Sequence, residues 1–183
     1  MLIIAITGMP GAGKSTAAKA LEAHGFKRIV MGDVIREETR RRGLEPDEKN
    51  TGKVMLELRE EYGPGAVAEV CLKRLKAMKE KVVIVDGIRS YAEAEAFSRH
   101  GKVKLLAVQA SRDRRFKLLT ERARSDAPTD RASFDERDKR ELSIGVGNAI
   151  ALGDETISNE HTTPMELGNR AVELVEWWVS TTA

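Results

Sequence analysis

The segment Gly8-Met9-Pro10-Gly11-Ala12-Gly13-Lys14-Ser15 constrains this chain more than any other feature. It satisfies the pattern G-x-x-x-x-G-K-[ST] and directly follows the apolar run at residues 2–7. Glycines let the backbone turn without side-chain clashes, and a helical pattern, residues 14–23, begins where the glycines end. The sequence therefore predicts a buried strand, a tight turn and a helix over residues 2–23.

The chemistry of such a turn favours phosphate. Its backbone N–H groups point inward and can surround phosphate oxygens, and the helix that follows adds the positive end of its dipole. Lys14 can reach the β- and γ-phosphates of a nucleotide, and the Ser15 hydroxyl can ligate Mg²⁺. We therefore expect ATP and Mg²⁺ as the cofactors. The residues expected to contact the nucleotide phosphates are Gly8, Met9, Pro10, Gly11, Ala12, Gly13, Lys14, Ser15 and Thr16.

Apolar runs of strand length recur along the chain, and helical patterns lie between them. The strand runs are residues 2–7, 28–31, 82–86, 103–110 and 155–159. The helical patterns are residues 14–23, 33–42, 51–62, 66–79, 91–100, 112–124 and 165–179. Runs that are continuously apolar are typical of parallel strands covered on both faces. The alternation predicts one α/β domain over residues 1–183, a doubly wound parallel sheet with helices on both faces.

Two polar stretches interrupt this alternation. Residues 40–61 lie between the second and third strands, and residues 125–140 are almost without apolar side chains. Neither stretch could form its own core, so we expect a flap at about 36–64 and a lid at about 122–142 on the main domain. The alternative is that both are solvated surface connections.

Asp86 ends the apolar run VVIV. A carboxylate at that place lies at the carboxyl edge of the sheet, beside the glycine-rich turn, where it can hold magnesium directly or through water. The alternative is an ordinary strand-ending Asp. With the turn present, we expect Ser15 and Asp86 to form the metal site.

Composition and missing motifs exclude several classes. The net charge is only +2, from 31 basic and 29 acidic residues, so there is no strong nucleic-acid-binding signature. Cys71 is the only cysteine, which excludes an intramolecular disulfide. No segment has the length of a membrane span or the form of a signal peptide, so we expect a soluble, cytoplasmic protein. The chain lacks the N-K-x-D motif of GTPases and the LSGGQ-like signature of transporter ATPases, and it is short for a typical AAA+ module.

Together with the glycine-rich turn, two short segments resemble the nucleoside-monophosphate kinases and their relatives, which include dephospho-coenzyme A kinases. Residues 31–36 read MGDVIR and resemble the T-G-D-x-[LI]-R segment of adenylate kinases. That resemblance implies that Arg36 grips the phosphate of the acceptor. Residues 86–89 read DGIR and resemble the D-G-F-P-R segment of the same enzymes, which implies that Arg89 is a second clamp.

A fourth stretch, residues 112–140, resembles the lid region of these kinases. The arginines that correspond to those leading into the lid and returning from it over the transferring phosphoryl are Arg115, Arg122, Arg124, Arg137 and Arg140. Asn159, after the last strand, lies where the loop bordering adenine is expected. The resemblance implies a P-loop domain of nucleoside-kinase type, with a five-stranded parallel sheet.

The chain also departs from adenylate kinases. Met31 replaces threonine, the D-G-x-R segment is one residue shorter, and residues 40–61 lack the usual acceptor-domain sequence. The pattern is closer to a group of largely uncharacterised archaeal adenylate-kinase-like proteins, which share D-G-I-R-S, E-R-D-x-R-E-L and G-[IV]-G segments. This resemblance does not identify the acceptor.

The implied activity is transfer of the γ-phosphoryl of ATP to a small acceptor, a nucleoside monophosphate. The alternatives are a hydroxyl kinase of the dephospho-coenzyme A type, and an ATPase that acts as a switch or assembly factor with a protein or RNA partner. Asp33 is either a helix N-cap that also contacts substrate or a general base for a hydroxyl. Neither the acceptor nor the oligomeric state is given by the sequence. The residues expected to be catalytic are Lys14, Asp33, Arg36, Arg89, Arg122 and Arg137.

Overall fold

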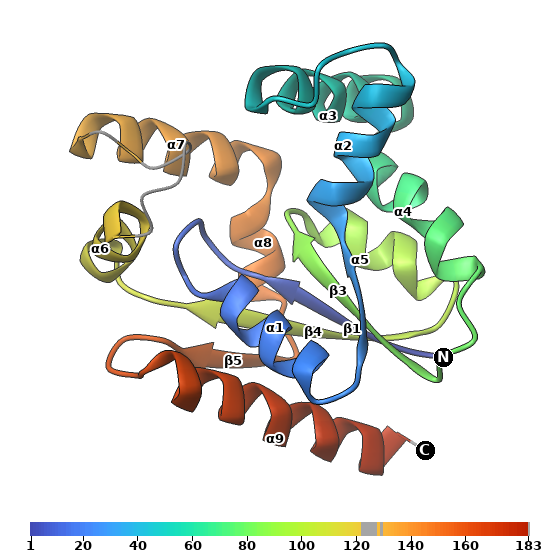
Figure 1. Ribbon diagram of the computed structural model, residues 1–183, viewed down its shortest axis with the longest axis vertical. Coiled ribbons are helices and arrows are strands. Elements are labelled where there is room, and N and C mark those ends of the chain that lie inside the picture. Colours follow the sequence, from blue (N-terminus) through green and yellow to red (C-terminus); the bar gives the residue numbers. More distant parts are fainter. Residues whose placement is uncertain (122–127, 129, 183) are drawn as a thin grey trace.

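A five-stranded parallel sheet forms the centre of the molecule (Figure 1). The computed structural model describes residues 1–121, 128 and 130–182. The strands are β1 (Leu2–Thr7), β2 (Lys27–Val30), β3 (Val82–Ile88), β4 (Lys102–Gln109) and β5 (Glu155–Ser158). Their order is β2-β3-β1-β4-β5, and every pair is parallel. The expected five-stranded parallel sheet is confirmed.

Helices cover both faces of the sheet. They are α1 (Lys14–Ala23), α2 (Met31–Arg41), α3 (Glu48–Tyr62), α4 (Ala66–Lys76), α5 (Tyr91–Ser98), α6 (Arg112–Glu121), α7 (Arg131–Ile144), α8 (Val146–Ala151) and α9 (Pro164–Thr182). No helix in the described ranges is long and apolar enough to cross a membrane.

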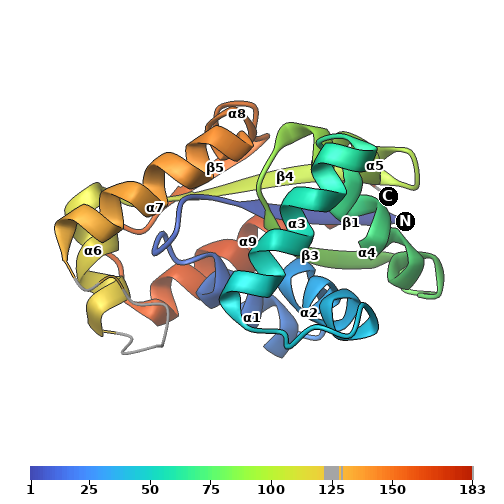
Figure 2. The same ribbon diagram turned by 90° about the horizontal axis from the view of Figure 1, so that it is seen from above.

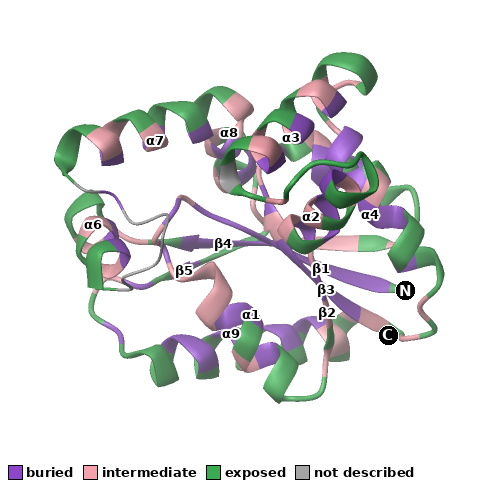
Figure 3. Ribbon diagram, turned by 45° about the horizontal axis from the view of Figure 1, so that its top comes forward, coloured by how far each residue is buried: buried purple, intermediate pink, exposed green. Residues whose placement is uncertain are grey.

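The sheet separates two apolar cores, which explains the continuous apolar runs of the sequence. Along β1, Ile4 and Ile6 face a core that contains Leu21 of α1 and Trp178 of α9. Ile3 faces the opposite core, together with residues of α2 to α5 and α8. Both faces of the strand are therefore fully buried, as the purple strands of Figure 3 illustrate. Burying two faces is what removes the polar alternation of a half-exposed strand.

The flap expected at about 36–64 is more firmly attached than its polar composition suggested. The side chains of Val54 and Leu58 on α3 lie in the main core, against the same cluster that α4 and α5 cover. Asp47 caps this helix by accepting a hydrogen bond from the Asn50 amide at 2.7 Å. Of the two alternatives for Asp33, capping of α2 is wrong. The N-cap is Val30, and Asp33 lies in the first turn.

Residues 131–144 form a helix that the sequence analysis did not predict. Asp130 caps α7 and forms a capping box with Ser133, and Gly145 ends the helix at a φ of 110°. Phe134 is its fully buried anchor and meets Phe116 of α6 edge to face, with ring centroids 5.5 Å apart. One aromatic side chain therefore gives this polar segment a place in the core. The two views show α6 and α7 on one side of the loop that follows β1, with α2 and α3 on the other (Figures 1 and 2).

Candidate active site

The loop between β1 and α1 is closely packed from behind. Gly8 has a φ of 147°, and a side chain there would meet the Val108 carbonyl oxygen at 2.2 Å. Gly13 has a φ of 108°, and a side chain there would meet the Asn159 amide nitrogen at 2.7 Å. Only glycine fits these positions without displacing backbone or a buried side chain. The rear of the loop is therefore fixed, which leaves its open face for a ligand.

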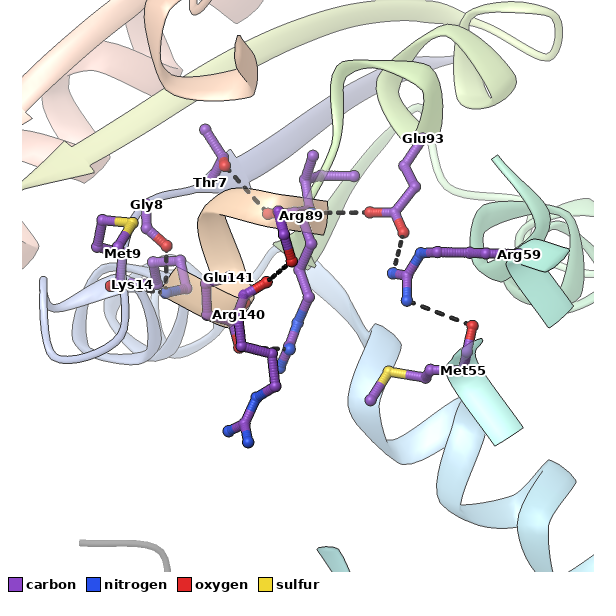
Figure 4. A network of polar contacts seen from close by, with 12 residues as sticks. Thr7, Gly8, Met9, Lys14, Met55, Arg59, Arg89, Glu93, Arg140 and Glu141 are labelled. Atoms are coloured by element: carbon purple, nitrogen blue, oxygen red, sulfur yellow. Dashed lines mark hydrogen bonds and ion pairs between the residues drawn. The ribbon is translucent and has the colours of Figure 1, made fainter. Parts of the chain in front are cut away.

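The open face offers hydrogen-bond donors. The backbone amides of Gly11, Gly13, Lys14 and Ser15 donate to no acceptor within the described part of the chain. The Lys14 ammonium donates to the carbonyl oxygens of Gly8, at 2.7 Å, and of Met9, at 3.0 Å (Figure 4). Amides left without partners at a helix N-terminus, beside a cation, fit the oxygens of a polyphosphate.

Two ionisable groups beside the loop have shifted pKa values. Burial of the Lys14 ammonium, and after it the positive charge of Arg89, lower the pKa of Lys14 from 10.5 to about 8. Burial raises the pKa of the Asp86 carboxyl, against the opposing charges of Lys14 and Arg28. Asp86 also lies 3.6 Å from the Arg28 guanidinium. The desolvation that causes both shifts also strengthens electrostatic contacts with a bound ligand.

Ser15 and Asp86 fit a magnesium site of the kind that substrate phosphates complete. Mg²⁺ in phosphotransfer sites takes one or two protein oxygens and fills its shell with phosphate oxygens and water. A hydroxyl at the start of α1, from Ser15, and the buried Asp86 carboxylate near the end of β3 are the residue types that would provide those oxygens. The described residues hold no cluster of three or more His, Cys, Asp or Glu side chains that could bind a metal without a substrate.

Arg89, the residue directly after β3, lies beside the loop because the strand ends irregularly. The pairing of β1 with β3 shifts register after Ile6, so that Thr7 lies opposite Ile88, and Gly87 has a φ of 110°. The Thr7 hydroxyl fixes this irregular segment by donating to the Ile88 carbonyl oxygen at 3.0 Å. Arg89 then lines the same cavity as Lys14.

One cavity, of about 710 Å³ including its open mouth, is lined by the loop, by the end of β3 and by residues of α6 and α7. Its lining residues are Gly8, Pro10, Gly11, Lys14, Ser15, Gly87, Arg89, Leu119, Arg137 and Glu141. Three of the side chains expected to be catalytic therefore meet in it: Lys14, Arg89 and Arg137. Asp33 and Arg36 are not among its lining residues. They form an ion pair with each other on α2, and Asp33 acts electrostatically on Asp86.

Helix α7 contributes two acidic side chains that the sequence analysis missed. Asp138 accepts two hydrogen bonds from the Arg115 guanidinium, at 2.8 and 2.6 Å. Arg115 also donates to the Pro10 carbonyl oxygen at 3.1 Å, so the pair ties α7 to the loop through α6. Glu141 accepts a hydrogen bond from Arg89 at 2.7 Å. The E-R-D-x-R-E-L segment (136–142) was available as a signal, because its positions 137, 138 and 141 fall near one face of a helix.

A smaller cavity lies on the other side of the loop. Its lining residues are Gly11, Gly13, Thr16, Arg114, Leu118, Asn159, Thr162, Pro164 and Leu167. Asn159 donates to the Ala12 carbonyl oxygen at 3.0 Å and accepts from the Thr162 hydroxyl at 2.8 Å. The Asn159 side chain is therefore engaged in holding the loop, while it also borders this cavity. Arg114 of α6 lines it as well.

Three further arginines were expected in the lid region. Arg122 and Arg124 fall outside the described residues. Arg140 lies on α7, and the structure describes it as exposed.

A parallel sheet in this strand order, with a glycine-rich phosphate loop after its central strand, defines a P-loop domain of the kinase-like type. Two solved structures share the fold: TT1252 from Thermus thermophilus (TM-score 0.69, 19% identity, 95% of each chain covered) and shikimate kinase from Bacteroides thetaiotaomicron (TM-score 0.62, 20% identity, 96% of this chain and 98% of that chain). At these identities the likeness concerns the fold alone.

Sequence comparisons identify the family. A family model described as an AAA domain matches residues 7–134, although the chain's length had argued against a typical AAA+ module. UPF0200 protein MJ1399 of Methanocaldococcus jannaschii is 45% identical over 162 residues, covering 87% of this chain and 82% of that protein. A UPF0200 protein of Thermococcus onnurineus is 41% identical over 180 residues, covering 96% and 97%. The chain therefore belongs to the UPF0200 family, and the expected likeness to archaeal P-loop kinase-like proteins is confirmed.

Proposed function

We propose that this protein is an ATP-dependent phosphotransferase that moves the γ-phosphoryl to a small acceptor of the nucleoside-monophosphate type. The observation that supports this most strongly is the larger of the two cavities described, which joins the loop of residues 8–15 to Arg89 and Arg137. A hydrolase needs room for water opposite the γ-phosphate. A kinase needs room and positive charge for a second anionic group, and this cavity has both.

Each residue has a role that its position supports. The loop amides and Lys14 bind the polyphosphate, and the cavity bordered by Arg114 and Asn159 is the place for the base. Mg²⁺, held by Ser15 and Asp86, would neutralise charge on the β- and γ-phosphates. Arg89 orients the acceptor phosphate in line with the transferring group.

Arg137 lines the same cavity as the loop, and its cation would stabilise the charge that develops on the transferring phosphoryl. Arg36 and Asp33, outside the cavity lining, would reach the acceptor beyond its phosphate. A phosphate acceptor is already ionised at neutral pH, so this chemistry requires no general base.

A coupled assay for ADP release tests the proposal. ATP and Mg²⁺ are supplied with a panel of nucleoside monophosphates and, in a separate arm, with dephospho-coenzyme A. The expected result is ADP release that depends on one of the monophosphates and that is lost in Lys14→Met. ADP release only with dephospho-coenzyme A would show that the acceptor is a hydroxyl and not a nucleoside monophosphate. Release indifferent to every acceptor would overturn the kinase proposal in favour of an ATPase, and stimulation by a protein or RNA partner would identify a switch.

A further inference from the structure

Arg89, the expected acceptor clamp, is already bound to an anion that the chain itself provides. Its Nη1 donates to Glu141 Oε1 at 2.7 Å, with the Arg89 side chain 38% exposed and the Glu141 side chain 7% exposed. Both side chains line the cavity that contains Lys14. We propose that the Glu141 carboxylate occupies the position on Arg89 that a substrate phosphate takes during the reaction, and that this phosphate displaces it. The inference rests on the proposed function, because it assigns Arg89 to phosphate binding.

The chemistry of the two anions supports the exchange. A guanidinium presents the same planar donors to a carboxylate and to a phosphate, so both bind it at the same edge. The charge of Glu141 reaches Lys14, where it counteracts the lowering of the Lys14 pKa. A phosphate bound between Lys14 and Arg89 would therefore lie close to the carboxylate. Two anions in a partly desolvated cavity repel each other, so the more highly charged phosphate favours release of Glu141.

The ion pair is not required to hold either of its partners in place. The Arg89 main-chain N–H donates to Glu93 Oε2 at 2.7 Å, and Glu93 is held in turn by Arg59 at 2.7 Å (Figure 4). On the other side, Asp138 fixes α7 through its two hydrogen bonds to Arg115. Glu141 can therefore leave Arg89 while the main chain at Arg89 and helix α7 both stay anchored. A purely structural ion pair would not need this duplication.

The Arg89–Glu141 ion pair also explains how the Arg89 guanidinium is kept in the cavity when no substrate is bound. An uncompensated Arg89 beside Lys14 and Arg137 would place like charges together. Glu141 offsets that repulsion until a phosphate arrives. The cost is a lower apparent affinity, because only molecules with the pair open can bind the phosphate. A pair that is closed about nine-tenths of the time would weaken binding about tenfold.

Calorimetric binding to Glu141→Gln tests the inference. One arm uses AMP alone, and the other uses a non-hydrolysable ATP analogue with Mg²⁺. We expect Glu141→Gln to bind one probe about tenfold more tightly than the unmodified chain. A gain with AMP identifies the acceptor phosphate as the displacing group, and a gain with the analogue identifies the γ-phosphate. No gain in either arm overturns the proposal.

Matched variants separate this effect from a general change of charge. Glu136→Gln alters the same charge on an exposed position of α7 and should leave both affinities unchanged. In an Arg89→Met background, Glu141→Gln should give no gain in affinity, because the guanidinium for which the carboxylate and the phosphate compete has been removed. If Glu141→Gln does not fold, Glu141→Asp shortens the reach of the carboxylate and should give a smaller gain in the same arm. A gain as large in Glu136→Gln as in Glu141→Gln would overturn the inference. None of these measurements requires phosphoryl transfer, so failure of the proposed kinase activity is distinguishable.

Discussion

Two ion pairs on opposite sides of the loop at residues 8–15 differ in how deeply they are buried (Figures 1 and 2). On the side of α6 and α7, the Arg115 and Asp138 side chains are only 4% and 10% exposed, and they share two short hydrogen bonds. On the side of α2, the paired Arg36 and Asp33 side chains are 44% and 53% exposed. A further pair, between Glu37 of α2 and Arg74 of α4, has side chains that are 57% and 42% exposed.

This difference indicates which side of the loop is preorganised. Breaking a buried pair leaves a charge without compensation, whereas an exposed pair exchanges its partner for water at little cost. Under the proposed function these are the nucleotide side and the acceptor side, so the nucleotide side would be fixed before substrate binds and the acceptor side could rearrange its surface contacts. One buried pair, Arg59 with Glu93, connects the acceptor side to the fixed frame.

The largest expected effect is on stability, in Asp138→Ala. Removing this carboxylate leaves the Arg115 guanidinium buried without its counter-charge, which costs about 3–5 kcal/mol. Because 1 kcal/mol corresponds to about 2–4 °C in a chain of this size, the melting temperature should fall by about 10 °C. Thermal unfolding followed by circular dichroism measures the change.

Asp135→Ala is the matched control on the same helix. Asp135 pairs with Arg112, and both side chains are largely exposed. The expected shift in melting temperature is within about 2 °C. Equal effects of the two variants would contradict the distinction between buried and exposed pairs.

Glu93→Gln tests the connection between the acceptor side and the frame. Glu93 is fully buried and accepts hydrogen bonds from the Arg89 main chain and from Arg59. The amide can keep one acceptor contact but loses the charge, so we expect a loss of about 1–3 kcal/mol in unfolding free energy. The KM for the acceptor should rise, because Arg89 loses its anchor, while calorimetric affinity for the ATP analogue stays within about twofold. Glu95→Gln, an exposed position on the same helix, should change neither quantity.

The pH dependence of nucleotide binding tests the electrostatics of the fixed side. The Lys14 pKa of about 8 belongs to the free protein, and a bound polyphosphate favours the protonated ammonium. As the pH rises through 8, Lys14 loses its proton in the free protein. Nucleotide binding then requires Lys14 to take up a proton, so the affinity for the ATP analogue falls by at most about tenfold per pH unit. Calorimetry of the ATP analogue from pH 7.5 to 9.5 measures this slope. Lys14→Met should bind weakly and without the slope, and an equal slope in that variant would exclude Lys14 as its source.

The fold was largely predictable because its determinants are local. The five apolar runs and the glycine pattern each specify their own element, and the structure places strands at all five runs. Helix α7 was missed because its one buried apolar side chain, Phe134, packs against Phe116 of a different helix. No local periodicity reports a contact of that kind.

The candidate site was predictable where backbone geometry defines it and less so where side chains pair. Lys14 and Arg89 follow directly from motifs at strand ends, and both line the cavity. Glu93 and Glu141 were not found, because an acidic residue on a charged helix has the same sequence appearance whether it is solvated or bound to an arginine. Arg36 was expected at the clamp from its motif, but α2 begins earlier than expected, at Met31, and the described Arg36 pairs with Asp33 outside the cavity lining.

The smallest expected effect is in Asp33→Asn, and it distinguishes two kinds of acceptor. The carboxylate lies in the first turn of α2 and is half exposed, so the variant should melt within about 2 °C of the unmodified chain. A phosphate acceptor brings its own ionised oxygen, and its transfer rate should stay within about threefold. A hydroxyl acceptor needs a base, and the amide of Asn cannot take up the proton, so that transfer would be lost. Steady-state rates with AMP and with dephospho-coenzyme A, measured on the same preparation, therefore report whether the exposed Asp33 on α2 takes part in the chemistry or only in substrate binding.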